Sequence, residues 1–234
     1  MPEVETIRKE LEEKVKNKKI LDIEIRLAKL LKNSSVEDFK KKVSSTSIED
    51  IKRRAKLLII ELSNKQSLLI HLKLTGRLLY TNPNEPVDKH THLIFNLNDG
   101  HQLRFWDLRQ FGYIKLVESG KLDEIPELKE FGPEAFGMYL ENFKALLVKK
   151  RTGKIKTLLM DQSFIAGIGN IYADEALFYA KIHPSRNINT LSESEITLLH
   201  KGAQKVLTAA LSKRGSSVDA YVDIYGKPGE YVPY

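Results

Sequence analysis

The hydrophobic pattern of the chain changes from a strand period to a helical period near residue 133, and this change limits the possible folds more than any other feature. In residues 48–117, apolar residues alternate with polar ones or form short runs between turn residues, which is typical of β-strands. In residues 133–214, apolar residues recur every three or four positions, which is typical of helices that bury one face. Strands followed by helices predict an α+β chain with two domains, divided into residues 1–125 and 126–234.

The β-rich part contains six predicted strands, and their spacing favours a sandwich or a barrel. Asp99 and Gly100 stand between two of them and form a strong hairpin signal. The predicted strands cover residues 56–62, 67–74, 76–80, 92–97, 102–106 and 112–117.

Three elements are expected ahead of these strands. Apolar residues at helical spacing predict a helix over residues 2–15, and Pro2 suits the start of that helix. A short helix is expected after Ser35, which is a favourable N-cap. Between the two helices a strand is predicted from the alternation of Leu21, Ile23, Ile25 and Leu27 with polar residues.

The helical part is predicted to contain four helices, at residues 139–149, 155–160, 170–181 and 193–211. The last of them follows Ser192, and Glu195 stands three residues later, as in a capping box. Its buried stripe is predicted to comprise Ile196, Leu199, Ala203, Val206, Leu207 and Ala210.

Net charge and the lack of cysteine narrow the classes of function. The chain has 38 Lys and Arg against 31 Asp and Glu, a net charge of +7 that favours a polyanionic partner such as nucleic acid. Without cysteine it has no disulfide, thiolate zinc site or cysteine nucleophile. No apolar run approaches the roughly 18 residues of a membrane span, and the acidic N-terminus lacks a secretory signal. We therefore expect a cytoplasmic, nucleoid-associated protein.

Pro2 and Glu3 are the first candidates for catalysis. If Met1 is removed, Pro2 presents a secondary α-amine, and part of such an amine is unprotonated at neutral pH because its pKa is about 7.7–8.0. This amine can attack a sugar aldehyde carbon to form an iminium ion that favours elimination, and Glu3 can transfer the protons. The same two residues also suit a helix start, so the dipeptide alone leaves both interpretations open.

Two further segments are candidates for contact with nucleic acid. Arg109 and Phe111 lie where a predicted strand passes into a loop, and such a pair can fill a gap in an unstacked duplex. The glycine-rich turn before Asn170 can bind a phosphate through backbone amides at a helix start. The basic residues that precede this turn are Lys149, Lys150, Arg151, Lys154 and Lys156. Each segment also has a structural interpretation. Phe111 can be a core residue beside a surface Arg109, and the basic residues can form a solvated face.

Several short motifs spread over nearly the whole chain occur in one order. They are Pro-Glu-Val-Glu-Thr-Ile-Arg at 2–8, Arg-Arg-Ala-Lys at 53–56, Ile-His-Leu-Lys-Leu-Thr-Gly at 70–76, Asp-Leu-Arg-Gln-Phe-Gly at 107–112, Gly-Pro-Glu at 132–134, and Gly-Ile-Gly-Asn-Ile-Tyr-Ala-Asp-Glu-Ala-Leu-Phe at 167–178. With these motifs the chain resembles the formamidopyrimidine-DNA glycosylase and endonuclease VIII family, and more closely its formamidopyrimidine (8-oxoguanine) branch.

The resemblance implies an N-terminal β-sandwich with flanking helices and a C-terminal helical domain with a helix–two-turn–helix motif. It implies a bifunctional DNA glycosylase and abasic-site lyase of base excision repair. Its substrate would be double-stranded DNA with oxidised purines or abasic sites, and it would act as a monomer without a cofactor. The rival interpretation is a catalytically silent homologue that binds damaged DNA without cutting it.

The resemblance also implies roles for single residues. In the catalytic site Pro2 is the nucleophile, Glu3 is the general acid, and Lys56 contacts a phosphate. The supporting positions of the active site are matched by Glu5, Lys156 and Glu175. The positions that contact DNA are matched by His71, Leu74, Arg109, Phe111, Asn170 and Tyr172. The loop that covers the flipped lesion is matched by Ser216, Ser217, Val218 and Tyr221.

Both ends of the sequence depart from the family pattern. The family usually begins Pro-Glu-Leu-Pro-Glu-Val-Glu-Thr, so Pro2 and Glu3 match either its catalytic pair or its second Pro-Glu pair. The family's C-terminal hairpin binds zinc through four cysteines, whereas this sequence contains no cysteine. A natural variant without the hairpin and a fragment are both consistent with this difference. We therefore expect no metal site. Within the chain, Leu74 replaces the usual methionine and Arg214 the usual glycine.

Overall fold

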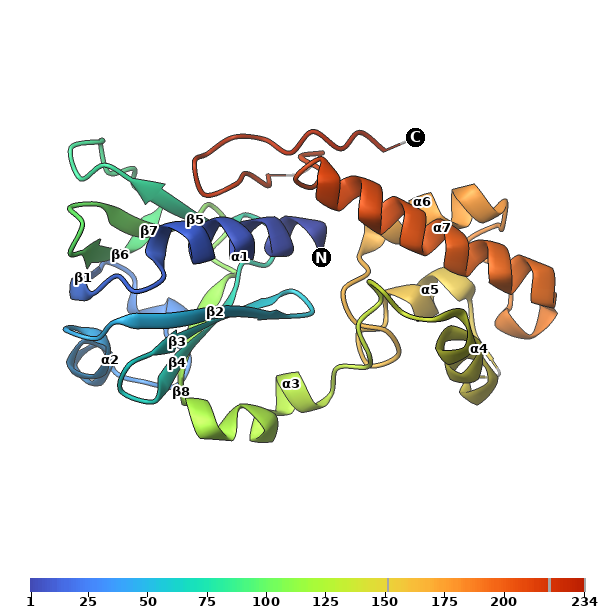
Figure 1. Ribbon diagram of the computed structural model, residues 1–234, viewed down its shortest axis with the longest axis horizontal. Coiled ribbons are helices and arrows are strands. Elements are labelled where there is room, and N and C mark those ends of the chain that lie inside the picture. The colour runs from blue at the N-terminus through green and yellow to red at the C-terminus, as the bar shows by residue number, and fades with distance from the viewer. Residues whose placement is uncertain (151, 219, 234) are drawn as a thin grey trace.

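The computed structural model describes residues 1–150, 152–218 and 220–233, and it forms two bodies joined by a helical connection (Figure 1). Arg151 of the predicted basic cluster lies outside the described residues. The first body holds two four-stranded sheets with one hydrophobic core between them, and the second is helical. The predicted two-domain α+β fold is confirmed, and the two separate sheets make the β-rich part a sandwich rather than a barrel.

All neighbouring strands of the sandwich are antiparallel. One sheet comprises, in spatial order, β1 (Ile20–Ile25), β6 (Thr91–Leu97), β7 (Gln102–Asp107) and β5 (Gly76–Thr81). The other comprises β2 (Ile48–Arg54), β3 (Leu57–Leu62), β4 (Gln66–His71) and β8 (Tyr113–Glu118). Two helices add side chains to the core: α1 (Pro2–Val15) contributes Ile7 and Leu11, and α2 (Val36–Val43) begins after its predicted cap Ser35.

The strand predicted from Leu21, Ile23, Ile25 and Leu27 is present as β1, and Ile25 and Leu27 pack against the core, but Leu21 lies outside it. Ile20 and Ile23 are buried, whereas Leu21 is 50% exposed. The pairing of β1 with β6 shifts its register between Ile20 and Asp22, so one extra residue interrupts the simple alternation. A bulge of this kind depends on the partner strand, which periodicity within one strand does not report.

Two predicted strands are too long because turns occupy their ends. Ala55 has φ +53°, a left-handed conformation that reverses the chain between β2 and β3, so Lys56 lies in a turn and not in a strand. The strand predicted to reach residue 74 ends at His71, and the Gly76 N–H donates to the Leu72 carbonyl at 2.9 Å, which closes a second turn. The hairpin predicted at Asp99 and Gly100 is confirmed between β6 and β7.

The helical body matches its prediction closely. Its helices are α4 (Leu140–Lys149), α5 (Ile155–Met160), α6 (Asn170–Ala180) and α7 (Glu193–Ser212), each within one residue of the predicted bounds. The capping box of Ser192 and Glu195 is present. The connection carries η2 (Ser119–Glu124) and α3 (Pro126–Lys129), and single 3₁₀ turns occur at η1 (Ala28–Leu30) and η3 (Ile188–Thr190). None of the helices in the described residues combines the length and the apolar composition that crossing a membrane would take.

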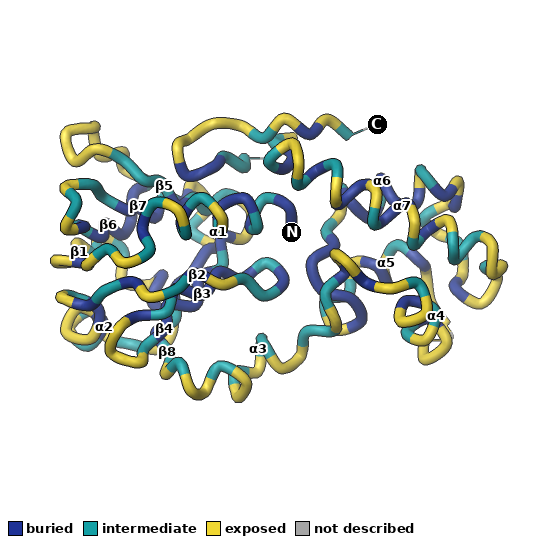
Figure 2. Tube along the Cα trace, in the orientation of Figure 1, coloured by how far each residue is buried: buried dark blue, intermediate teal, exposed yellow. Residues whose placement is uncertain are grey.

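Each body contains a residue from the opposite end of the chain. α1 lies along the sandwich, and its first residue points into the space between the two bodies (Figure 1), where the Met1 side chain joins the helical core. The segment after α7 returns over α1 and places Ile224 in the sandwich core. Both residues are buried, and Figure 2 shows buried stretches of the tube at the start of α1 and in the segment after α7. The start of the chain is thereby held at the junction of the bodies.

Candidate active site

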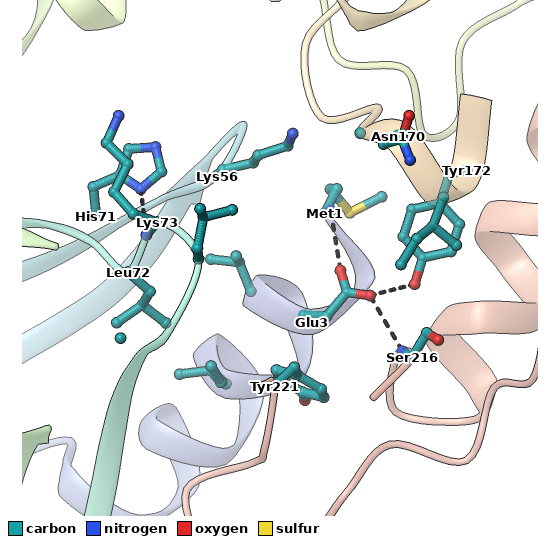
Figure 3. Close-up of a pocket in the computed structure, with 16 residues that line it drawn as sticks. Met1, Glu3, Lys56, His71, Leu72, Lys73, Asn170, Tyr172, Ser216 and Tyr221 are labelled. Carbon is teal, nitrogen blue, oxygen red and sulfur yellow. Dashed lines mark hydrogen bonds and ion pairs between the residues drawn. The ribbon is translucent and has the colours of Figure 1, made fainter. Parts of the chain in front are cut away.

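A cavity of about 270 Å³ opens at this junction (Figure 3). The start of α1, the turn between β2 and β3, the turn after β4, the start of α6 and the segment after α7 all contribute to its wall. The predicted site residues that line it are Glu3, Lys56, His71, Leu74, Asn170, Tyr172, Ser216 and Tyr221. The fold therefore brings together residues that are up to about two hundred positions apart in sequence.

Glu3 is the hydrogen-bonding centre of the cavity. One carboxylate oxygen accepts hydrogen bonds from the Tyr172 hydroxyl and from the Ser216 N–H at 3.2 Å, and the other lies 3.3 Å from the Met1 α-amine (Figure 3). Burial by itself raises the pKa of Glu3, but the α-ammonium and the two donors outweigh it, and the pKa ends below its ordinary value. Glu3 is consequently ionised at neutral pH and can accept a proton.

Two amines face Glu3 across the cavity. Burial lowers the pKa of the Met1 α-amine to about 6, and burial likewise lowers the pKa of the Lys56 side chain. With Met1 present the Pro2 nitrogen is an amide, and the Met1 carbonyl accepts the first helical hydrogen bond from the Glu5 N–H at 3.0 Å. Pro2 therefore remains a prediction for a chain without Met1. The Met1 amine was missed by the sequence analysis, and its only signal was its place before Pro2.

His71 and Asn170 present polar groups to the same cavity from opposite bodies. Burial lowers the pKa of His71 to about 3, so its ring is neutral at physiological pH. The Lys73 N–H donates to the His71 Nδ1 atom at 3.0 Å, so the proton of the neutral ring is on Nε2. Asn170 begins α6 directly after the turn at Gly169. Both positions can donate to a phosphate that spans the junction.

The residues predicted to enter a duplex lie together on two neighbouring loops. The side chains of Leu74 and Phe111 are 57% and 54% exposed, although both are large and apolar. The Arg109 guanidinium lies 4.9 Å from the centre of the Phe111 ring. Buried Asp107 joins the two loops, because it accepts hydrogen bonds from the Thr75 hydroxyl and the Arg109 N–H. These hydrogen bonds hold the two loops that carry the exposed side chains next to each other.

The three predicted supporting residues lie outside the cavity wall. Glu5 pairs with Arg8 at 2.9 Å and with Arg53 at 2.8 Å. Lys156 pairs with Asp174 at 2.7 Å on the helical body. Glu175 is buried, and it accepts a hydrogen bond from the Tyr231 hydroxyl at 3.0 Å. Among the described residues, no group of three or more His, Asp or Glu side chains could hold a metal ion.

Comparison with known proteins identifies this arrangement. The sequence profile of the formamidopyrimidine-DNA glycosylase N-terminal domain matches residues 1–114, and that of the formamidopyrimidine-DNA glycosylase H2TH domain matches residues 131–221. The formamidopyrimidine-DNA glycosylase of Pelotomaculum thermopropionicum is 41% identical over 232 residues, which span 99% of this chain and 84% of that protein. The chain belongs to the formamidopyrimidine-DNA glycosylase family.

Solved structures of this glycosylase family have the same fold. The Lactococcus lactis enzyme in complex with DNA that contains an abasic site superposes with a TM-score of 0.89 at 35% identity, over 98% of this chain and 84% of the other. A mutant of the Lactococcus lactis enzyme in complex with Fapy-dG-containing DNA superposes with a TM-score of 0.90 at 35% identity, again over 98% of this chain and 84% of the other. The predicted family membership is confirmed over nearly the full length of the chain.

The loop that a glycosylase of this family is expected to fold over a lesion is held in two ways. Ser217 accepts a hydrogen bond from the Gly229 N–H at 2.8 Å and donates one to the Tyr221 carbonyl at 2.7 Å, while Val218 is 67% exposed. Arg214 precedes the loop with φ +60°, in the left-handed region that favours glycine. Its guanidinium pairs with Glu10 at 2.9 Å and with Asp223, so ion pairs hold the strained residue.

Proposed function

We propose that the chain is a bifunctional DNA glycosylase and abasic-site lyase that removes oxidised purines from double-stranded DNA. The observation that carries the proposal is the pairing of an ionised carboxylate, Glu3, with an amine of lowered pKa at the start of the chain. A neutral amine is nucleophilic, and a carboxylate beside it can move the proton that the amine releases.

The steps follow from these two groups. The amine nitrogen forms a bond to C1′ of the lesion nucleotide, and the C1′–base bond breaks, so the base leaves with the bonding electron pair and takes up a proton from solvent water. Glu3 accepts the proton of the attacking nitrogen and returns it when the sugar ring opens. The resulting imine withdraws electrons from C2′, which loses a proton, and the 3′ phosphate then leaves by β-elimination.

Eversion of the lesion supplies the substrate for these steps. A stacked base keeps C1′ beyond the reach of any amine, and moving it out of the helix costs about a few kcal/mol. Exposed Leu74 and Phe111 can fill the gap while Arg109 hydrogen-bonds the orphaned base. The relatives solved with abasic-site and Fapy-dG-containing DNA support a duplex with such lesions as the partner.

The test of the proposal is cleavage of a duplex that contains a single 8-oxoguanine or formamidopyrimidine. We expect release of the damaged base and a strand break at its position. A catalytically silent homologue, the second candidate, would bind the same duplex tightly and leave both the base and the strand intact. The retained cavity with two amines of lowered pKa favours the enzyme.

Replacing Phe111 with Ala is expected to weaken binding to a lesion duplex about tenfold or more, because the variant cannot offset the cost of unstacking. Binding to single-stranded abasic DNA should change less than about threefold, since nothing has to be unstacked there. Both affinities can be measured by fluorescence anisotropy. Phe136→Ala removes another exposed phenylalanine, outside the two loops, and serves as the control. Equal losses of affinity for both DNAs would show that Phe111 only contacts DNA and does not fill the gap left by an unstacked base.

The salt dependence of DNA binding is expected to be shallow, with a slope of log affinity against log salt on the order of −3 to −5. Neutral His71 releases no counterion, which leaves Lys56 and the basic residues before α6. Lys56→Ala should reduce the slope by about one unit and keep lesion preference, because phosphate contacts position the DNA. Lys52→Ala removes a lysine of the same hairpin that pairs with Glu61 and should leave the slope unchanged. A lost preference with an unchanged slope would contradict the phosphate role of Lys56.

A further inference from the structure

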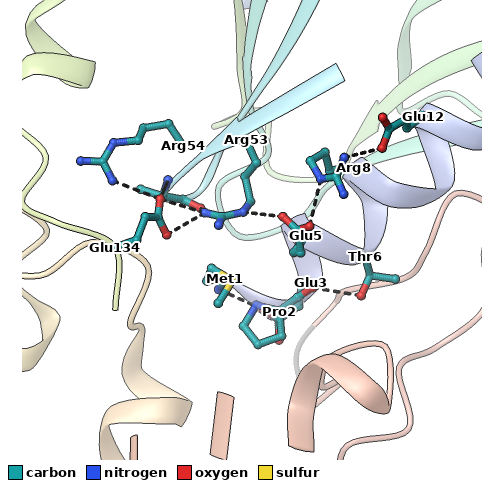
Figure 4. A network of polar contacts seen from close by, with 11 residues as sticks. Met1, Pro2, Glu3, Glu5, Thr6, Arg8, Glu12, Arg53, Arg54 and Glu134 are labelled. Atoms are coloured by element: carbon teal, nitrogen blue, oxygen red, sulfur yellow. Dashed lines mark hydrogen bonds and ion pairs between the residues drawn. The ribbon is translucent and has the colours of Figure 1, made fainter. Parts of the chain in front are cut away.

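Glu134 lies in the segment that enters the helical body, and it contacts three consecutive residues of the sandwich (Figure 4). Its carboxylate accepts hydrogen bonds from the Arg53 guanidinium at 3.0 Å, from the Arg54 guanidinium at 3.1 Å and from the Ala55 N–H at 2.7 Å. Lys56 is the next residue along the chain. The three residues that Glu134 contacts therefore directly precede Lys56, whose amine faces the cavity.

The turn held by Glu134 has an unfavourable backbone conformation. Ala55 is fully buried and has φ +53°, a left-handed conformation that L-residues rarely adopt unless surrounding contacts fix it. Arg53 adds a second contact to the turn, since it donates to the Ala55 carbonyl at 2.7 Å and to Glu5 of α1 at 2.8 Å. Without the Glu134 carboxylate, the guanidinium groups of Arg53 and Arg54 would lose the acceptor that they share. The Ala55 N–H would lose its acceptor as well.

The same segment is also fixed to the turn that starts α6. The Ala166 N–H donates to the Pro133 carbonyl at 2.8 Å, and the Ala135 N–H donates to the Ala166 carbonyl at 2.9 Å, so Glu134 is flanked by two backbone hydrogen bonds. Three residues later, the turn at Gly169 lies against the Lys56 amine: a Cβ atom at Gly169 would be 3.0 Å from the Lys56 Nζ atom. Glu134 thus contacts both sides of the site at once.

We propose that Glu134 is a positioning residue that fixes Lys56 against the turn before Asn170 and so sets the spacing between the phosphate-binding groups of the two bodies. The proposal rests on the proposed function for the phosphate role of these groups. A residue that acts through Lys56 has an effect only while Lys56 is present, and this property separates positioning from a general contribution to stability.

A double-mutant cycle with Glu134→Ala, Lys56→Ala and the double variant tests this dependence. The probe is a duplex with a tetrahydrofuran abasic-site analogue. We expect Glu134→Ala alone to weaken binding about tenfold and to lower the salt slope by about one unit. In the Lys56→Ala background the same change should weaken binding less than about twofold. If the losses of affinity in the two single variants simply multiply in the double variant, the proposal is wrong.

Glu127→Gln is the matched control. Glu127 lies in the same connection and pairs with Lys115 at 2.5 Å, but it contacts neither Arg53 nor the turn before Lys56. This variant should bind the probe as the unaltered chain does. If Glu134→Ala does not fold, as a thermal melt would show, Glu134→Gln takes its place in the cycle, because its amide oxygen still accepts the Ala55 N–H while the charge is lost.

A readout without DNA keeps the proposal separate from the proposed function. Reductive methylation with ¹³C-formaldehyde gives each lysine an NMR signal, and Lys56→Arg assigns that of Lys56. In the unaltered chain burial holds the pKa of Lys56 below its ordinary value, and in Glu134→Ala we expect it to rise as the amine moves into solvent. An unchanged titration of Lys56 would refute the positioning role even if no DNA were bound, whereas failure to bind DNA with the expected titration would refute only the proposed function.

Discussion

Cyanoborohydride added to the chain and an abasic-site duplex is expected to yield a covalent protein–DNA adduct through the α-nitrogen at the start of the chain. The open abasic sugar carries an aldehyde, a neutral amine condenses with it, and the reductant converts the imine into a stable bond. Peptide mass spectrometry of the adduct should place the DNA on Pro2 where Met1 has been removed. Acetylation of the α-amine should reduce the adduct at least about a hundredfold, because an acylated nitrogen forms no imine.

The position of the adduct decides between the amines of the cavity. The intact mass of the protein shows whether Met1 is retained, and Pro2→Gly, which keeps a primary amine once Met1 is removed, should give less adduct than Pro2. Normal adduct formation by a chain that retains Met1 would exclude Pro2 as the nucleophile and assign the role to the Met1 amine. An adduct on Lys56 would contradict both assignments.

The pH dependence of trapping adds a check for a chain that retains Met1. Its amine has a pKa lowered to about 6, so the neutral and reactive form is lost below that pH and dominates above it. The single-turnover trapping rate should therefore rise with pH up to about 6 and level off near 7. A rate that kept rising to pH 9 would indicate an amine with an ordinary pKa.

Local sequence signals predicted most of the elements. The hairpin at Asp99 and Gly100 and the capping box at Ser192 each depend on residues within a few positions, and both occur in the structure. The bulge in β1 and the left-handed turn at Ala55 were not predicted, because each depends on contacts with distant segments. Ala55 in particular carries no turn signal of its own, and its conformation is explained by the contacts that Glu134 and Arg53 make with its backbone.

The candidate site was predictable only in part for the same reason. Glu3, His71 and Asn170 were indicated by short motifs, and the fold places all three on one cavity. The contact between Arg53 and Glu134 joins residues 81 positions apart, and no periodicity connects them. The lowered pKa of His71 arises from burial, and that of Glu3 arises from the α-ammonium and two hydrogen-bond donors that outweigh burial; a sequence records none of these.

Glu3→Gln is expected to reduce release of an oxidised base by a factor of about 10²–10⁴, the usual contribution of a positioned acid–base group. The amide keeps the shape of the side chain and can still accept a hydrogen bond from the Tyr172 hydroxyl, but it cannot take the proton of the attacking amine. Excision can be measured under single-turnover conditions with an 8-oxoguanine duplex, and trapping on an abasic-site duplex in parallel.

The comparison of these two substrates isolates the chemistry that Glu3 performs. A preformed abasic site carries no base that must leave, so trapping by Glu3→Gln should fall far less than excision does. Glu5→Gln is the control, because Glu5 lies two residues further along α1 and pairs with Arg8 and Arg53 outside the cavity wall. It should lower the melting temperature and leave the ratio of excision to trapping unchanged. If Glu3→Gln reduced both activities equally, Glu3 would act on a step that excision and trapping share or on the fold, and the proton transfer that accompanies base release and ring opening would belong to another group.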